Sequence, residues 1–107
     1  MITVELNNIP EAFQTKLRLM IISALATGKK TFSEVKSITG ASDGNISAQM
    51  SKLEQMRYIT MTKEFVRKKP LTTYELTDTG LNSFEDYVEM LNRIIQKKPN
   101  ENAAKKL

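Results

Sequence analysis

Two groups of side chains in this sequence have the chemistry to recognise a polyanion. The first is a run of small and polar residues in a segment expected to be helical, residues 43–56. Small hydroxyl and amide groups on a helix can approach base-pair edges in the DNA major groove, about 12 Å wide, without steric conflict. The residues predicted to form this DNA-contacting face are Ser42, Asp43, Gly44, Asn45, Ser47, Ala48, Ser51 and Lys52.

The second group is basic and follows shortly after the first. Arg67, Lys68 and Lys69 are consecutive, and Lys63 precedes them. Cations at a loop tip can pair with phosphates or enter the minor groove, where the negative potential is enhanced. Residues 28–70 carry nine basic and four acidic side chains, whereas residues 71–96 carry one basic and five acidic ones. A positive charge concentrated in one part of a chain is typical of a protein that binds nucleic acid.

The composition argues against several other kinds of chemistry. The chain has no cysteine and no histidine, so it has no thiolate ligand, disulfide or imidazole base. The sequence shows no nucleophile–base pair and no Gly-rich phosphate loop, and the carboxylates Glu85, Asp86 and Glu89 fit the solvated side of a helix. We therefore expect no enzyme activity, no metal and no cofactor.

The hydropathy pattern predicts no membrane segment and no secretion signal. The longest apolar stretch runs from Leu17 to Ala26, is too short to span a bilayer and contains Arg18 and Ser23. The first residues lack the pattern of a signal peptide. We expect a cytoplasmic protein.

Three predicted helices lead up to the basic segment and position the polar face. The first starts near Pro10 and ends at Gly28. Thr31 and Glu34 have the spacing of a capping box, which starts a short second helix with Phe32, Val35 and Ile38 inward, and Gly40 ends it. Ser42 then caps the third helix, whose inward stripe is Ile46, Met50 and Leu53.

A hairpin and a long helix complete the predicted order. Residues 58–62, extended by Phe65 and Val66, and residues 71–76 have strand composition, and residues 67–70 form a basic turn between them. Thr77 caps the last helix, in which apolar residues recur at intervals of three and four, a two-heptad seam. That seam consists of Leu81, Phe84, Val88, Leu91 and Ile95.

This order predicts an α+β, mainly α fold: a winged helix-turn-helix with a three-helix core, a β-hairpin wing and a long C-terminal helix. We expect one domain over residues 1–107. Within it, residues 10–77 form the DNA-binding core and wing, residues 78–97 form a dimerisation helix, and residues 98–107 form a flexible tail.

The ordered set of motifs resembles the MarR/ArsR-like winged-helix regulators, in particular their small single-domain branch. The resemblance covers about residues 10–96 and is carried by residues 18–25, 32–35, 45–54, 58–59 and 70–80, ending in a Tyr-x-Leu-Thr-x-x-Gly pattern. Two positions depart from the family pattern. Arg57 stands where the family often has glycine before the strand aromatic, and Leu81 follows Gly80 where the family often has arginine.

The resemblance implies a homodimer that binds a pseudo-palindromic site on double-stranded DNA and regulates transcription, most simply as a repressor. The two recognition helices would lie about 34 Å apart, one turn of DNA. The last helix, with part of the first, would form the dimer contact through Phe13, Leu17, Leu81, Phe84, Val88, Leu91 and Ile95.

Plainer interpretations of the same residues stay open at this point. The polar helix face and the basic turn also suit a solvated surface, and the apolar seam also suits docking on the protomer's own core. The alternative function is a winged-helix adaptor that binds another protein and not DNA. An adaptor would show an exposed apolar patch on the third helix, whereas this one is polar.

Overall fold

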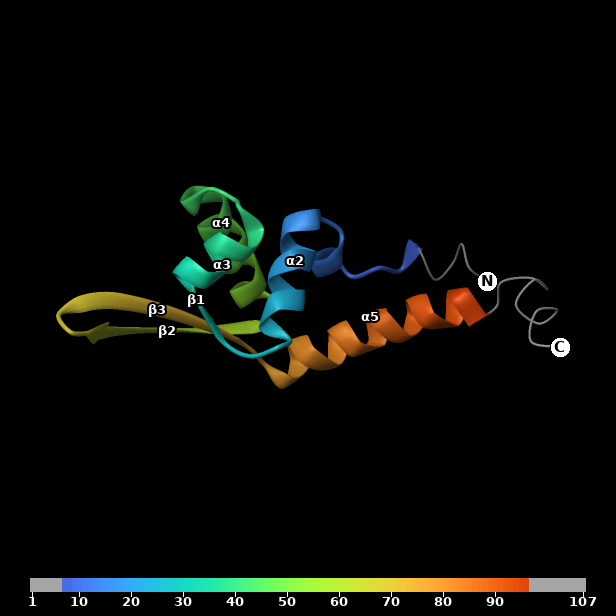
Figure 1. Cartoon of the computed structure of the whole chain (residues 1–107). Coiled ribbons are helices and arrows are strands. Elements are labelled where there is room, and N and C mark those ends of the chain that lie inside the picture. Colours follow the sequence, from blue (N-terminus) through green and yellow to red (C-terminus); the bar gives the residue numbers. More distant parts are fainter. Residues whose placement is uncertain (1–6, 97–107) are drawn as a thin grey trace, which may run out of the picture.

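The computed structural model describes residues 7–96 and confirms the predicted winged-helix fold. A three-stranded antiparallel sheet has the order β1-β3-β2, and β2 and β3 form the wing (Figure 1). The elements in chain order are η1 (Glu11–Phe13), α2 (Lys16–Leu25), β1 (Lys30–Thr31), α3 (Phe32–Thr39), α4 (Asp43–Gln55), β2 (Ile59–Val66), β3 (Lys69–Leu76) and α5 (Asp78–Gln96).

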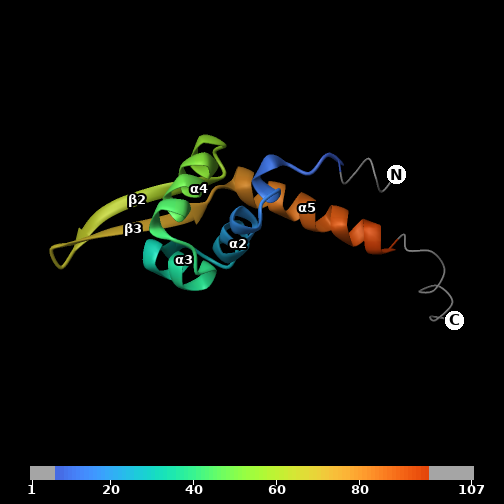
Figure 2. The same ribbon diagram turned by 90° about the horizontal axis from the view of Figure 1, so that it is seen from above.

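Helices α2, α3 and α4 gather into one cluster, and two long elements leave it in opposite directions. Figures 1 and 2 show the β2–β3 hairpin extending from one side of the cluster and α5 from the other. The predicted end of the last helix at residue 97 and the predicted tail, residues 98–107, lie outside the described residues.

Local side-chain caps fix the ends of α3 and α4 as predicted. The backbone N–H of Glu34 donates to Thr31 Oγ1 at 3.2 Å, and the N–H of Thr31 donates to Glu34 Oε1 at 2.8 Å. The bond from the Thr31 backbone lowers the pKa of the Glu34 carboxyl. Gly40 ends α3 with a left-handed φ of 70°, and Ser42 caps α4 by accepting from the N–H of Asn45.

The prediction of one continuous first helix from Pro10 was wrong. A 3₁₀ turn, η1, comes first, and α2 begins only at Lys16. The break lies at Thr15, whose backbone is extended and whose hydroxyl accepts from the N–H of Arg18 at 3.3 Å. A threonine that can cap the following turn competes with continued helix at its own position.

The core lies where the three helices meet the base of the sheet. Ile21 and Ile22 of α2, Val35 of α3, and Ile46 and Leu53 of α4 are fully buried in it.

The prediction that Ile38 points inward was wrong, because its side chain is 47% exposed. Phe32 and Ile38 are six residues apart and so lie about 120° apart around the helix. Val35 occupies the centre of the buried stripe, and only the Phe32 flank meets the sheet, where its ring contacts Tyr74.

The hairpin turn is shorter than predicted. Only Arg67 and Lys68 form it, with left-handed φ angles of 53° and 67°, and Lys69 pairs with Val66 inside the sheet. Two consecutive left-handed residues are typical of a type I′ turn, which matches the twist of the strands but usually uses asparagine and glycine. The wing therefore has two cationic residues at turn positions whose left-handed backbone is easier for asparagine and glycine to adopt.

Arg57, which departs from the family pattern, is also left-handed. Its φ is 64°, so it adopts the conformation that a glycine would adopt more easily. Thr77 stabilises this connection between α4 and β2. Its hydroxyl donates to the Arg57 carbonyl at 2.6 Å, and its N–H donates to the Tyr58 carbonyl at 2.9 Å.

Thr77 also caps α5 as predicted, because it accepts from the N–H of Gly80 at 3.0 Å. A Cβ at Gly80 would lie only 2.3 Å from the Tyr58 carbonyl oxygen, so this close approach requires glycine.

Candidate nucleic-acid interface

Helix α4 separates its residues into a buried and an exposed side. Ile46, Met50 and Leu53 hold the helix on the core. All eight residues predicted to contact DNA are exposed, the N-cap included: Ser42, Asp43, Gly44, Asn45, Ser47, Ala48, Ser51 and Lys52. The sequence prediction of a small, polar, outward face on this helix therefore agrees with the structure.

A cleft of about 270 Å³ lies between α4 and the wing. Ser47 and Ser51 line it from the helix, and Lys63 and Thr72 line it from the hairpin. Cross-strand pairing places Lys63 directly opposite Thr72. The structure thus brings predicted helix and wing residues to one surface, a juxtaposition that sequence spacing alone did not reveal.

Glu54 also lines this cleft, although it was not among the predicted site residues. It lines the cleft together with Tyr74, and burial, followed by the negative charge of Glu54, raises the pKa of the Tyr74 hydroxyl. The carboxylate of Glu54 on the helix disfavours an anionic group beside it, whereas Lys63 on the hairpin attracts one.

The wing presents its cations with one large apolar side chain among them. Lys63, Arg67, Lys68 and Lys69 are all exposed. Residues alternate across a strand, so Phe65 lies on the same face as Lys63, and it pairs with Pro70 across the hairpin. Its side chain is 78% exposed. From the sequence, Phe65 was predicted only to extend the strand.

An ion pair modifies the start of the polar face. Lys36 Nζ of α3 lies 2.6 Å from Asp43 Oδ1 at the first turn of α4. The lysine offsets the one acidic charge in the predicted DNA-contacting set, which would otherwise repel phosphates. Asp43 in turn suits the positive end of the helix dipole.

The predicted seam of α5 forms an open apolar groove. A groove of about 700 Å³ is lined by all five seam residues, Leu81, Phe84, Val88, Leu91 and Ile95, together with Ala26 at the end of α2. Leu81, Val88 and Ile95 are exposed in the protomer.

Phe13 and Leu17, the two residues of the first segment that were assigned to the same contact, do not line this groove. Phe13 is only 4% exposed and stacks on Tyr87 with ring centroids 4.8 Å apart, so it joins η1 to α5 inside the protomer. Leu17 packs against the core and is partly buried.

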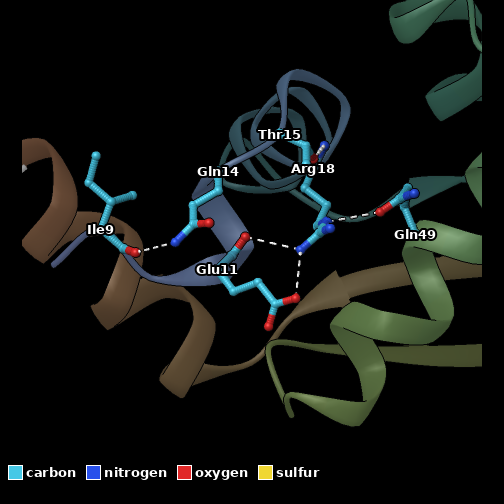
Figure 3. Close-up of polar contacts among 6 residues, drawn as sticks. All are labelled: Ile9, Glu11, Gln14, Thr15, Arg18 and Gln49. Atoms are coloured by element: carbon cyan, nitrogen blue, oxygen red, sulfur yellow. Dashed lines mark hydrogen bonds and ion pairs between the residues drawn. The ribbon is translucent and has the colours of Figure 1, made fainter. Parts of the chain in front are cut away.

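Arg18 is a buried cation that sequence analysis treated only as an interruption of an apolar stretch. Figure 3 shows its guanidinium between η1 and α4. Its Nε donates to Gln49 Oε1 at 2.8 Å, and its Nη1 donates to the Glu11 carbonyl at 3.0 Å and lies 3.7 Å from Glu11 Oε2. No sequence signal connects Arg18 to Gln49, because the two are 31 residues apart.

Residues 7–96 contain neither a bilayer-spanning helix nor a cluster of metal-ligating side chains. No helix in this part of the chain has the length and hydropathy needed to span a bilayer. Over the same range, no three acidic, histidine or cysteine side chains come together in a way that could hold a metal ion.

Solved structures share this architecture. A transcriptional regulator homologue from Pyrococcus horikoshii superposes with a TM-score of 0.78 at 24% identity, covering 87% of this chain and 95% of that one. A putative MarR-family regulator from Enterococcus faecalis gives a TM-score of 0.73 at 16% identity, covering 88% and 86%. PadR from Bacillus subtilis, solved with operator DNA, gives 0.59 at 22% identity, covering 64% of this chain and 45% of that one.

The sequence itself matches one family model. No curated protein matches the chain in sequence. The model for the winged helix DNA-binding domain, however, matches residues 17–95, from α2 almost to the end of α5, and so includes the polar face, the wing and the apolar groove. The chain belongs to the winged helix DNA-binding domain family.

Proposed function

We propose that this protein is a homodimeric, sequence-specific regulator of transcription that binds double-stranded DNA in the cytoplasm. The observation that carries the proposal is the cleft in which Ser47 and Ser51 of α4 face Lys63 of the wing. One wall offers small hydrogen-bonding groups for base edges and the other offers a cation for the phosphate backbone. Double-stranded DNA presents both kinds of partner side by side.

The two parts of the interface take different roles in this proposal. Helix α4 enters the major groove with the N-terminal residues of its polar face, among them Asn45 and Ser47, toward the bases. Arg67, Lys68 and Lys69 at the wing contact the backbone or the adjacent minor groove. The family match supports DNA as the ligand, and PadR, of the same fold, was solved bound to operator DNA.

The groove on α5 supports the homodimer. Leu81, Val88 and Ile95 are exposed along one face of the helix, and burying them against a second copy would remove this apolar surface from water. A two-fold dimer would present two α4 helices to a pseudo-palindromic operator, with half-sites about 34 Å apart. Repression follows most simply, because occupying the site is enough to block polymerase.

The direct test is a mobility-shift assay with genomic fragments at two salt concentrations. Binding should weaken steeply as salt rises, because phosphate contacts release counterions. Absence of any affinity at low salt would refute the proposal, and a stable protein partner in its place would favour the adaptor function.

Variants separate the two roles. Changing Arg67, Lys68 and Lys69 together to alanine should weaken binding to all sequences alike, whereas Asn45→Ala or Ser47→Ala should change the sequence preference. Arg93→Ala on α5 removes a cation outside the proposed interface and serves as the control. If both sets of variants had the same effect, the assignment of roles would be wrong.

Sedimentation tests the dimer. Val88→Glu places a charge in the α5 groove and should give monomers, whereas Asp86→Asn, at an exposed position of α5 outside the groove, should leave the dimer intact. A monomeric wild-type protein at micromolar concentration would refute this part of the proposal.

A further inference from the structure

A directional chain of hydrogen bonds runs from the buried Arg18 to the exposed Asn45 of the DNA-contacting face. Arg18 is 6% exposed, and its Nε donates to Gln49 Oε1 at 2.8 Å (Figure 3). Gln49 Nε2 in turn faces Asn45 Oδ1 at 3.5 Å, a long hydrogen bond one helical turn away. The chain thus links the core of the protomer to the first turns of α4.

The direction of this chain follows from the chemistry of arginine. A guanidinium has only donors, so Gln49 must turn its carbonyl oxygen toward Arg18. The amide nitrogen of Gln49 then points the other way and can only donate, so Asn45 meets it with its oxygen. The orientation of both amides, normally open to a flip, is set by one buried cation.

The cation itself is well fixed. Its Nη1 donates to the Glu11 carbonyl at 3.0 Å and lies 3.7 Å from the Glu11 carboxylate. Glu11 belongs to η1, which α5 holds through the stack of Phe13 on Tyr87. The guanidinium therefore has partners on two elements and cannot turn without losing one of them.

We infer that Arg18, acting through Gln49, makes Asn45 a hydrogen-bond donor toward the major groove, so that Asn45 favours guanine over cytosine. With Oδ1 turned to Gln49, the Nδ2 group is left for the DNA. Guanine offers two acceptors there, O6 and N7, and thymine offers one, O4, whereas cytosine offers a donor. Adenine, the usual partner of asparagine, requires the amide oxygen and nitrogen together. The inference rests on the proposed function and names the base edge that the same interface reads.

The deciding variant is Gln49→Glu. A carboxylate still accepts from Arg18 but has no proton to donate, so Asn45 should turn its Nδ2 toward position 49 and present Oδ1 to the DNA. Selection of bound duplexes from a random pool, followed by titration of the four base variants at the contacted position, reads the result. Wild type should favour guanine over cytosine by about tenfold. The variant should reverse this order.

Controls separate this effect from charge and folding. Gln55→Glu adds the same charge at an exposed position of the same helix and should weaken all sequences equally without changing the preference. Gln49→Met removes the chain without adding charge, so Asn45 is free to turn and the preference should broaden to include adenine. Asn45→Ala should abolish the preference in each background. Thermal unfolding confirms that each variant is folded.

Three outcomes overturn the inference while leaving DNA binding intact. Gln49→Glu could lower affinity with an unchanged order of bases, which would make Arg18 a structural residue only. Gln49→Met could retain the guanine preference. Wild type could prefer cytosine or adenine at the position that depends on Asn45. Absence of wild-type binding to any duplex at low salt would instead refute the proposed function.

Discussion

Helix α4 and the wing carry the two halves of the proposed DNA interface, and they are attached to the molecule in opposite ways. Helix α4 rests on the core through Ile46, Met50 and Leu53. Strand β2 is exposed at every residue after Ile59. Base readout depends on exact placement of donors and acceptors, whereas phosphate contacts tolerate adjustment and carry no sequence information. The core therefore fixes the helix that we propose reads the bases, whereas the hairpin that we propose contacts phosphates has no core of its own.

The largest effect should come from cutting the support of α4. Ile46→Ala removes a fully buried side chain and should lower the free energy of unfolding by about 2–5 kcal/mol. Phe65→Ala removes a larger apolar group from the wing, but Phe65 is mostly exposed, so the change should stay within about 0.5 kcal/mol. Urea unfolding measures both. Equal losses of unfolding free energy in the two variants would mean that the side chains of the wing pack as tightly as those that hold α4.

A change at the wing turn should move stability and affinity in opposite directions. Arg67→Asn with Lys68→Gly places residues that favour left-handed backbone at both turn positions and should raise the free energy of unfolding by about 1 kcal/mol. The same variant removes two cations and should lower DNA affinity at low salt by about tenfold. The exchange Arg67→Lys with Lys68→Arg keeps the charge and should leave both quantities near wild type. Unchanged DNA affinity in the Arg67→Asn, Lys68→Gly variant would show that the turn does not contact DNA.

The smallest effect should appear at the capping box of α3, which braces α4. The pKa of Glu34 is lowered in the folded state by the bond from the Thr31 N–H, so its contribution is present above the unfolded value of 4.5 and is lost as pH falls through the folded value. Glu34→Gln keeps an acceptor for that N–H and should reduce the loss of thermal stability between pH 7 and pH 3. Melting curves of the two proteins check this. Identical acid sensitivity would show that other carboxylates dominate.

The sequence predicted most of what local interactions decide. The caps at Thr31, Ser42 and Thr77 and the left-handed end at Gly40 were all predicted, because each depends on residues within one turn of the helix end. The exposed polar face of α4 followed from helical periodicity for the same reason. The left-handed backbone at Arg57 was not predicted; Arg57 was noted only as a departure from a family pattern.

The features that could not be predicted from the sequence depend on tertiary structure. The contact of Arg18 with Gln49 joins residues that the fold alone brings together. The burial of Phe13 needs α5 to be in place beside η1. The two-residue turn lacks the usual asparagine and glycine, so the basic run predicted a longer turn than the one that forms.

The two-residue turn also limits how far the wing can reach. In an antiparallel hairpin the pairs that exchange hydrogen bonds recur at every second residue, and a tight turn must be closed by such a pair, here Val66 and Lys69. A wing of this design can be lengthened or shortened only by two residues in each strand. Each such step moves the tip by about 7 Å, roughly the rise of two base pairs. The distance that the wing reaches can thus change only in such steps, and a single inserted residue cannot adjust it.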